Sequence, residues 1–428
     1  MPNHADLLKL FKEAYRNLDL LPLLEPEELS QFRVDYARDV LEDLEQLVED
    51  SPSGDSKIVF SGHRGCGKST LLAEFARKCS PQYFVVGFSI ADTIEMSDVN
   101  HINILFAIAV SLMTEAEKHK VKINKSTKDD FYRWFATHTK IETETLSAET
   151  AAGFNILEIL KGQLKANAAV RQEIKQKFQP QISVLISRID EIARAIASAT
   201  QKEILVVIDD LDKLELGVVT QVYRDNVKAI FQPNFRIIFT IPIAALRDKT
   251  IRPILDTETN NQIVMMPVSK LFEKGSNQRR NPEPLSKNVE VLRQILRQRV
   301  SEQILESEIA DKMALYSGGV LRELIRIANE CCRIGLRLIR RNPTATDITI
   351  NQDVLEEAII KLRNDFATPL SQADYEILRK IYNDYRPDDP NQHEFLLLLH
   401  GVHIIEYRDT LNWYNVHPIV MDLFLPKP

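Results

Sequence analysis

The sequence predicts an α/β protein in which a parallel sheet with a helical insertion is followed by a helical lid and a winged-helix-like domain. Two observations carry this prediction. Five short runs rich in Val, Ile and Phe alternate with helical stretches, which is typical of strands buried on both faces of a parallel sheet. A block of helices then occupies the C-terminal part of the chain, and two short β-rich runs follow it.

The composition is that of an ordinary globular protein, with 44% hydrophobic and 27% charged residues in a chain of 428. This length allows several domains at roughly 100–200 residues each. The chain carries 54 basic and 61 acidic side chains, a net charge of −7. The chain is therefore not a protein that binds nucleic acid through positive charge over its whole surface. The composition does not exclude a local basic patch.

The four cysteines, at positions 66, 79, 331 and 332, form no disulfide framework and suit a reducing compartment. Met1 to Leu10 lacks the apolar core of a signal peptide. The most membrane-like stretch, Val99 to Thr114, is shorter than the roughly 20 apolar residues of a membrane span. We therefore expect a buried helix there, no membrane partner and a cytoplasmic location.

Residues 1–50 are predicted to be helical, because apolar residues recur at helical spacing from Leu7 to Tyr15 and from Val40 to Val48. Leu21 to Pro26 is an extended connector, since each proline disfavours helix at the residue before it. Ser51 to Gly54 then ends this segment as a turn.

The buried strands follow. They are predicted at Ile58 to Ser61, Tyr83 to Ile90, Ile204 to Ile208, Phe235 to Ile241 and Gln262 to Met266. Lys68 and Asp209 lie 141 positions apart, whereas a βαβ unit needs only about 30 residues. Residues of about 115–200 are therefore predicted to be a helical insertion. Its apolar stripe from Ile182 to Ile196 packs either on the core or on another subunit.

A polar loop from Glu273 to Lys287 marks the next boundary, and helical stretches at 289–305, 308–341 and 352–364 form the predicted lid. In the last segment, two β-rich runs at Val402 to Tyr407 and Asn412 to Val416 read as a hairpin after helices. The predicted domains are an N-terminal helical segment (1–50), a core (51–272), a lid (288–366) and a winged-helix-like domain (370–428).

The strongest functional signal is a glycine-rich loop that fits G-x-x-x-x-G-K-[ST] in full and lies between a predicted strand and a predicted helix. In such a loop the main-chain N–H groups point at phosphate oxygens, and the positive end of the following helix adds to the field. Lys68 would contact the β- and γ-phosphates, and the Ser69 hydroxyl would bind Mg²⁺. The predicted nucleotide-binding residues are Gly62, His63, Arg64, Gly65, Cys66, Gly67, Lys68, Ser69 and Thr70.

A second signal is the apolar run Ile204 to Ile208, which leads directly into Asp209, Asp210 and Asp212. The carboxylates thus stand at the carboxyl end of a buried strand, where open α/β sheets bind ligands. We predict that Asp209 holds Mg²⁺, directly or through water, and that Asp210 orients or deprotonates the attacking water. Asp212 is interpreted as the cap of the next helix.

Two further candidate site residues are interpreted from the glycine-rich loop and the acidic strand end together. Thr240 ends a predicted strand and is placed to hold the attacking water or to sense the γ-phosphate. Arg322 lies in the first turns of a helix that opens after Gly318 and Gly319, from which it would reach back to the γ-phosphate. The alternative interpretations are that Thr240 is a threonine at a strand end without a catalytic role and that Arg322 is an ordinary surface arginine.

Together these motifs resemble the AAA+/STAND group of P-loop NTPases over residues of about 30–428, the insertion excepted. The resemblance implies ATP binding and hydrolysis that drive a conformational or oligomeric switch. It assigns roles to Lys68, Ser69, Asp209, Asp210, Thr240 and Arg322. The second acid is Asp where many AAA+ members have Glu, and the initiator-like and KAP-like branches both stay open.

No arginine finger is evident, and Arg236, Arg247 and Arg252 are the candidates.

A basic stripe lies on one face of the helix after Gly319 and is partly paired with Glu323 and Glu330. It consists of Arg322, Arg326, Arg333, Arg337 and Arg340. His400 with His403, and Cys331 with Cys332, lack a second pair at metal-ligand spacing and are interpreted as structural.

The predicted function is therefore an ATP-dependent switch that acts on a protein partner or through self-assembly. Two alternatives remain from the sequence. One is a DNA-associated ATPase of the initiator or transposition type, for which the arginine stripe would contact DNA phosphates. The other is a module that holds nucleotide without turning it over.

Overall fold

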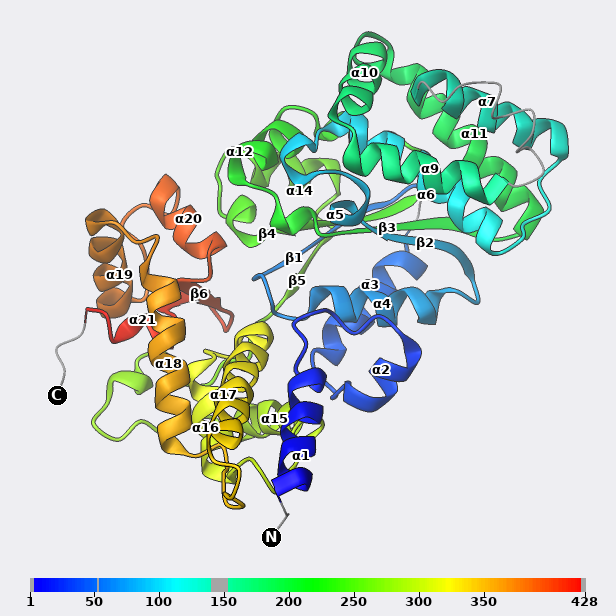
Figure 1. The fold of residues 1–428 in the computed structure, drawn as a ribbon. Coiled ribbons are helices and arrows are strands. Elements are labelled where there is room, and N and C mark those ends of the chain that lie inside the picture. The colour runs from blue at the N-terminus through cyan, green and yellow to red at the C-terminus, as the bar shows by residue number, and fades with distance from the viewer. Residues whose placement is uncertain (1–3, 52–53, 140–152, 425–428) are drawn as a thin grey trace. The chain divides into compact units, whose positions relative to one another are not determined.

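The computed structural model describes residues 4–51, 54–139 and 153–424 of the chain, and Figure 1 shows the fold as a ribbon. The chain forms two compact units. The first, here called the lid unit, comprises the residues up to Arg38, the segment Gly62–Thr70 and the residues from Met266 onward. The second, the sheet unit, comprises Asp39–Ser61 and Leu71–Met265.

The sheet has five strands in the order β2-β3-β4-β1-β5, and all five strands predicted from the apolar runs are confirmed. They are β1 (Lys57–Gly62), β2 (Tyr83–Ser89), β3 (Glu203–Asp209), β4 (Arg236–Pro242) and β5 (Ile263–Met266). β3 runs parallel to β2 and to β4, with Ser89 opposite Asp209. The predicted parallel sheet is thus confirmed, and β3 is buried at every residue from Ile204 to Ile208.

Helices surround this sheet in the sheet unit. They are α3 (Arg38–Glu49), α4 (Lys68–Cys79), α5 (Ile90–Thr93), α6 (His101–Lys118), α7 (Lys125–Thr139), α9 (Gly153–Ala166), α10 (Ala168–Phe178), α11 (Ile182–Thr200), α12 (Leu216–Val219), α13 (Val227–Ile230) and α14 (Arg252–Glu258). Nearly every side chain of α6 is buried, because α9, α10 and α11 pack around it. The apolar stretch from Val99 to Thr114 therefore forms a core helix, as predicted. Among the described residues, no helix is long and apolar enough to cross a membrane.

The predicted helical insertion corresponds to α7, α9, α10 and α11. Its apolar stripe on α11 packs against α6 and β3, so of the two alternatives it faces the core of its own chain. Polar contacts also join the insertion to the rest of the sheet unit. The buried Arg171 of α10 pairs with Asp98 at 2.6 Å, and both its outer nitrogens and its Nε are used in hydrogen bonds.

The lid unit is mainly helical. Its elements are α1 (His4–Asn17), α2 (Pro26–Phe32), α15 (Ser286–Arg297), α16 (Ser307–Tyr316), α17 (Leu321–Arg341), α18 (Gln352–Ala367), α19 (Gln372–Asp384), α20 (His393–His400), β6 (Ile404–Tyr407), β7 (Trp413–Val416) and α21 (Pro418–Met421). β6 and β7 pair antiparallel, so the predicted hairpin after helices is confirmed. The division of the chain into four domains stays a prediction.

α1 packs closely on α17, because Gly335 offers no side chain at their contact. A Cβ atom on Gly335 would lie 2.2 Å from Cε1 of Phe11, a buried residue of α1. The side-chain amide of Asn329 also donates to the carbonyl oxygen of Leu18 at 3.0 Å. The N-terminal helix is therefore an integral part of the lid unit.

Candidate functional site

The glycine-rich loop begins where β1 ends at Gly62 and stops where α4 begins at Lys68. Its three glycines have positive φ angles, of 156° at Gly62, 82° at Gly65 and 101° at Gly67. Residues with a Cβ atom rarely adopt such angles, so glycine is needed at each of these positions. The loop thus has the curled backbone that phosphate-binding loops require.

The Lys68 ammonium group is buried against this loop. Its Nζ donates to the carbonyl oxygens of Gly62 at 3.0 Å and His63 at 2.8 Å, and the residue is 4% exposed. Cys66 is buried beside it, with Sγ 3.9 Å from Nζ, which agrees with a spacer role. The predicted phosphate-binding lysine is therefore in place at the loop itself.

The other loop residues lie at the rim. Arg64 and Ser69 are partly exposed, and the Thr70 hydroxyl accepts a hydrogen bond of 3.1 Å from the main-chain N–H of Leu23. The connector after α1 is thus joined to the loop. This contact was not predicted, since nothing in the pattern around Leu23 indicates a partner so far along the chain.

The first turn of α17 contacts the same loop within the lid unit. The main-chain N–H of Arg322 donates to the carbonyl oxygen of Gly65 at 2.9 Å. A Cβ atom on Gly65 would lie only 2.4 Å from Cβ of Arg322, and one on Gly67 would lie 3.1 Å from Cδ1 of Leu321. The structure therefore brings the predicted Arg322 to the phosphate-binding loop, and its contact with a γ-phosphate stays a prediction.

His63 links the loop to the hairpin. Its Nε2 accepts a hydrogen bond of 2.7 Å from the main-chain N–H of Glu406 in β6. Both residues are buried, at 1% and 2% exposure. The sequence motif leaves His63 at a variable position, so this bond could not be read from the pattern. Two parts of the C-terminal segment, α17 and β6, therefore hold the loop.

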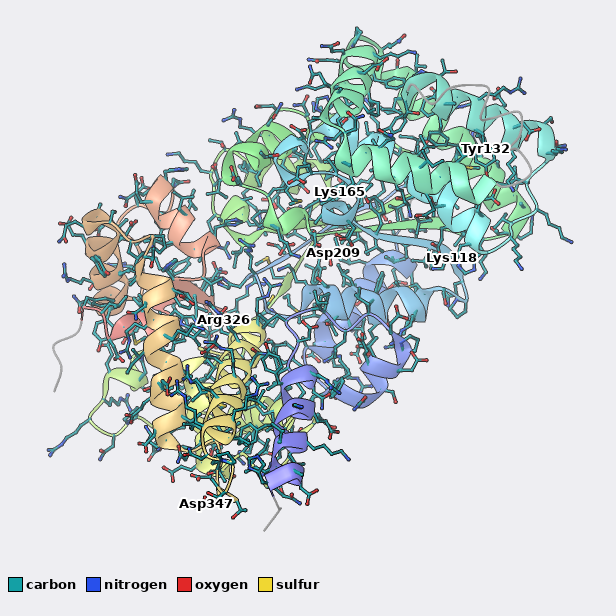
Figure 2. The ribbon with its side chains drawn as sticks, in the orientation of Figure 1. Lys118, Tyr132, Lys165, Asp209, Arg326 and Asp347 are labelled. Atoms are coloured by element: carbon teal, nitrogen blue, oxygen red, sulfur yellow. The ribbon has the colours of Figure 1, made fainter. Side chains whose placement is uncertain are left out.

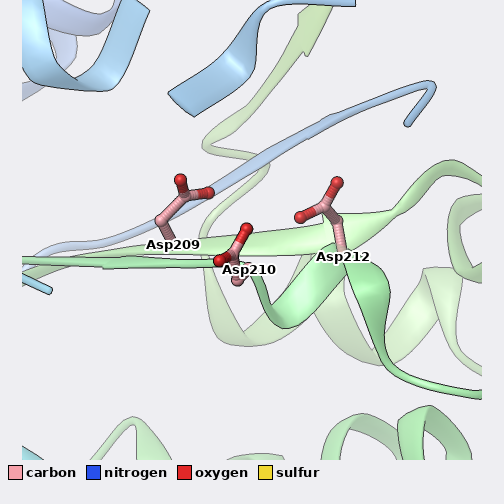
Figure 3. Close-up of side chains that lie close together, drawn as sticks. All are labelled: Asp209, Asp210 and Asp212. Carbon is pink, nitrogen blue, oxygen red and sulfur yellow. The ribbon is translucent and has the colours of Figure 1, made fainter. Parts of the chain in front are cut away.

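In the sheet unit, the three predicted carboxylates gather at the end of β3 and in the turn after it (Figure 3). One oxygen from each of Asp209, Asp210 and Asp212 lies within 4.8 Å of the others. Among the described residues, this is the sole group of three or more His, Cys, Asp or Glu that could hold a metal ion. Figure 2 labels Asp209 at the end of its strand.

Asp210 has a strained backbone, with φ at 67°, and two side-chain partners. Its Oδ2 accepts from the Ser89 hydroxyl at 2.7 Å, and its Oδ1 pairs with Nζ of Lys213 at 2.5 Å. Sequence reasoning missed both partners. Ser89 could have been found as the polar end of the neighbouring strand, and Lys213 as the cation three residues after the acid.

The prediction that Asp212 caps the next helix is wrong. Asp212 is buried inside a short 3-10 turn, Leu211–Lys213, and α12 has Glu215 at its N-cap position. The chain turns immediately after β3, so the carboxylate of Asp212 is directed toward the other two acids rather than toward a helix end.

Thr240 is completely buried on β4, and its hydroxyl bonds to the end of β3. Its Oγ1 accepts from the main-chain N–H of Leu211 at 3.0 Å and donates to the carbonyl oxygen of Ile208 at 3.3 Å. The Tyr223 hydroxyl donates to the carbonyl oxygen of Thr240 at 3.0 Å. In this structure the threonine fixes the turn that carries the acids, and γ-phosphate sensing stays a prediction.

The three candidate arginine fingers differ in their surroundings, and Arg236 is the buried one. It is buried at the first residue of β4, pairs with Glu203 and lies over the Tyr83 ring at 5.4 Å. It is therefore at the end of the strand opposite to Thr240. Arg252 pairs with Asp256 on its own helix at 2.7 Å, and Arg247 follows a short 3-10 helix after β4.

The histidine and cysteine pairs behave as structural groups. Nε2 of His403 lies 3.1 Å from the carbonyl oxygen of Phe366, to which it donates. Burial raises the pKa of the Cys331 thiol well above its usual value, and it raises that of Cys332 to about 12. Both thiols therefore stay protonated and unreactive.

Comparison with known proteins places part of this chain in a family. Residues 37–222 match the family model of an AAA ATPase domain. No curated protein matches the chain.

Three solved structures are similar over most of the chain. Cdc6p from Pyrobaculum aerophilum shares 10% identity and a TM-score of 0.42, with 94% of each chain covered. Orc1 from Aeropyrum pernix, solved in complex with DNA, shares 12% identity and a TM-score of 0.40, with 92% of each covered. RuvB from Thermotoga maritima shares 14% identity and a TM-score of 0.38, with 96% of this chain and 100% of that chain covered.

The family match covers the loop, the three acids Asp209, Asp210 and Asp212, and strands β1, β2 and β3. It confirms the resemblance to AAA+ proteins that the motifs indicate. Residues 37–222 of this chain are therefore similar to an AAA ATPase domain.

Proposed function

We propose that this protein is an ATP-binding and ATP-hydrolysing switch that couples its nucleotide state to a change in its C-terminal segment. The observation that carries the proposal is the pair of hydrogen bonds on the glycine-rich loop, from Arg322 to Gly65 and from Glu406 to His63. A loop that binds phosphates through its own backbone cannot be reshaped without affecting groups bonded to that backbone.

The loop residues fit a triphosphate by their chemistry. The positive φ angles of the glycines give the loop the curled backbone from which main-chain N–H groups can donate to phosphate oxygens. Lys68 is the proposed phosphate-binding cation. It now donates to two loop carbonyls, and a phosphate oxygen would be a stronger, charge-assisted acceptor for the same ammonium group.

Mg²⁺ prefers oxygen ligands, and the hydroxyl and carboxylate groups at Ser69 and Asp209 supply that donor set. These two residues are the proposed metal ligands. When bound, the ion would neutralise negative charge on the phosphates. Asp210 is the proposed base that orients or accepts a proton from the attacking water, Arg322 the proposed γ-phosphate contact, and Thr240 holds the acidic turn.

We propose that turnover is slow. The two carboxylate oxygens of Asp210 already accept from Ser89 and pair with Lys213, so an attacking water must compete with both partners for this carboxylate. The same pairing favours the second candidate, a module that holds nucleotide without turnover. Release of inorganic phosphate above the rate of uncatalysed hydrolysis would exclude that candidate.

Replacing Lys68 with Ala tests the proposal. We expect the variant to lose ATP binding, measured by the fluorescence of a labelled ATP analogue, while Lys78→Ala on the exposed face of the same helix retains it. Wild-type affinity in Lys68→Ala would contradict the proposal.

A second measurement separates the modes of switching. Sizing the protein with and without a non-hydrolysable ATP analogue reports self-assembly. A larger species with the analogue indicates nucleotide-gated self-assembly. Unchanged size, with altered proteolysis of the C-terminal segment, indicates a switch that acts on a protein partner.

A further inference from the structure

A hollow of about 580 Å³ lies between α1 and α17 in the lid unit. Four arginines of α17 line it together with Tyr15 and Leu336; they are Arg333, Arg337, Arg340 and Arg341. Their spacing of four, three and one residues places all four on adjoining rows of one helix face. This set, here called the arginine hollow, includes no residue of the glycine-rich loop or of the acidic turn.

Intramolecular ion pairs leave much of this charge available. Arg333 pairs with Glu330 at 2.6 Å, and Arg337 pairs with Glu357, but their side chains are 49% and 42% exposed. The Arg337–Glu357 pair is exposed on both sides and contributes roughly 0–1 kcal/mol, so a stronger anion can replace it. Arg333 is held more firmly, by two hydrogen bonds to the buried Glu330. Arg340 and Arg341 are exposed and form no ion pair with any residue that the structure describes.

Stabilisation of the helix end does not account for four arginines. The C-terminus of a helix carries a charge equivalent to about −0.5, which a single cation offsets. Yet α1 and α17 together hold nine Lys or Arg and four Asp or Glu, a net charge of +5, in a chain whose total is −7. Positive charge is therefore concentrated on these two helices against the balance of the whole protein.

We propose that the arginine hollow binds the phosphate backbone of a nucleic acid. From Arg333 to Arg341 the helix rises about 12 Å at 1.5 Å per residue. One nucleic acid strand presents three or four phosphates over that length, at about 3.4 Å of helix axis per charge. Each guanidinium group offers a planar pair of donors that matches a phosphate.

The aromatic wall of the hollow favours nucleic acid over an acidic polypeptide. Tyr15 is 40% exposed, although it is a large aromatic ring. A base can stack on such a ring, which typically contributes about 1–3 kcal/mol. A run of Asp or Glu side chains would satisfy the arginines but would leave the tyrosine without a stacking partner.

The test measures binding of a fluorescently labelled 20-nucleotide single strand, and of the matching duplex, to the full-length protein by anisotropy without ATP or Mg²⁺. Its result is thus independent of the proposed ATPase function. We expect binding at low salt, with a slope of log K against log[salt] of about −3 for four phosphate contacts on a single strand. The two probes show which form of nucleic acid the hollow prefers.

Two double variants make the test specific. Replacing both Arg340 and Arg341 with Ala should weaken binding at least tenfold. It should also make the slope of log K against log[salt] shallower, by the amount expected for the loss of one to two phosphate contacts. Arg279→Ala with Arg280→Ala removes two adjacent exposed arginines elsewhere in the lid unit and should leave both unchanged. Tyr15→Ala should weaken binding of the single strand, while Tyr15→Phe should not.

Three results would overturn the proposal. One is no binding of either probe at low salt by a protein whose circular dichroism is that of a folded chain. Another is an equal loss of nucleic acid affinity in the two double variants. The third is competition by polyglutamate as effective as by unlabelled oligonucleotide, which would assign the hollow to an acidic polypeptide.

Discussion

The main-chain N–H of Arg322 donates a hydrogen bond of 2.9 Å to the carbonyl oxygen of Gly65, so the first turn of α17 is bonded to the glycine-rich loop. The two residues are 257 positions apart in the sequence. Their contact is tight because Gly65 has no Cβ atom: one built there would lie 2.4 Å from Cβ of Arg322. Any change at Gly65 is therefore also a change at the start of α17.

Replacing Gly65 with Ala is expected to weaken ATP binding by at least tenfold. The φ angle of 82° is unfavourable for alanine by about 1–2 kcal/mol, and the added methyl group must also displace Arg322. Titration with a fluorescent ATP analogue measures the effect. Gly217→Ala is the matched control, because a Cβ atom there meets nothing within 4 Å, and an equal loss in both variants would contradict the prediction.

Removing the His63 ring should loosen the hairpin. In His63→Ala the buried N–H of Glu406 loses this acceptor, which costs about 1–3 kcal/mol. Hydrogen–deuterium exchange of the peptide containing β6 should accelerate accordingly. His63→Gln, whose side-chain oxygen can accept the same bond, should restore much of the protection; equal exchange in both variants would refute the role of this bond.

Changes at Asp210 and Lys213 should move ATP turnover in opposite directions. Asp210→Asn removes the proposed base, and we expect phosphate release to fall about a hundredfold or more with ATP affinity little changed. Lys213→Ala removes the ammonium group that competes with water for the carboxylate and should raise the rate. Lys228→Ala, whose side chain is 81% exposed on α13, should change neither. A lower rate in Lys213→Ala would show that the pair is needed for catalysis.

Acid should destabilise the lid unit through His417. Burial, followed by nearby His403, Arg326 and His63, lowers the pKa of His417 to about 3. The unfolded chain, with a pKa near 6.5, then binds more protons than the folded one. Stability is thus full above about pH 6.5 and falls as the pH drops toward 3, by about 2 kcal/mol between pH 7 and 5.

Urea unfolding at pH 7 and pH 5 measures this loss. Nδ1 of His417 accepts from the main-chain N–H of Ile419, and the side-chain oxygen of Asn can accept the same bond. His417→Asn should therefore be less sensitive to pH than the wild type by about 2 kcal/mol. An identical pH dependence in both proteins would show that His417 does not titrate on unfolding.

The sequence by itself determined the local features of this protein. Each of the five strands is a short apolar run, and its burial follows from that composition. The glycine-rich loop is equally local, because the glycines and Lys68 lie in one short segment whose backbone geometry they impose. The acids at the end of β3 are local for the same reason: a buried strand followed directly by closely spaced aspartates places them at one edge of the sheet.

Only the tertiary structure decided which groups hold these motifs in place. Ser89 reaches Asp210 because β2 and β3 are neighbours in register, and strand order is not written in either strand. Arg322 and Glu406 meet the loop through main-chain N–H groups, which every residue except proline has, so no side-chain pattern marks them. Asp212 was misread as a helix cap because a turn follows β3 directly. Hydrogen bonds between distant backbone groups depend on packing, and packing depends on the whole chain.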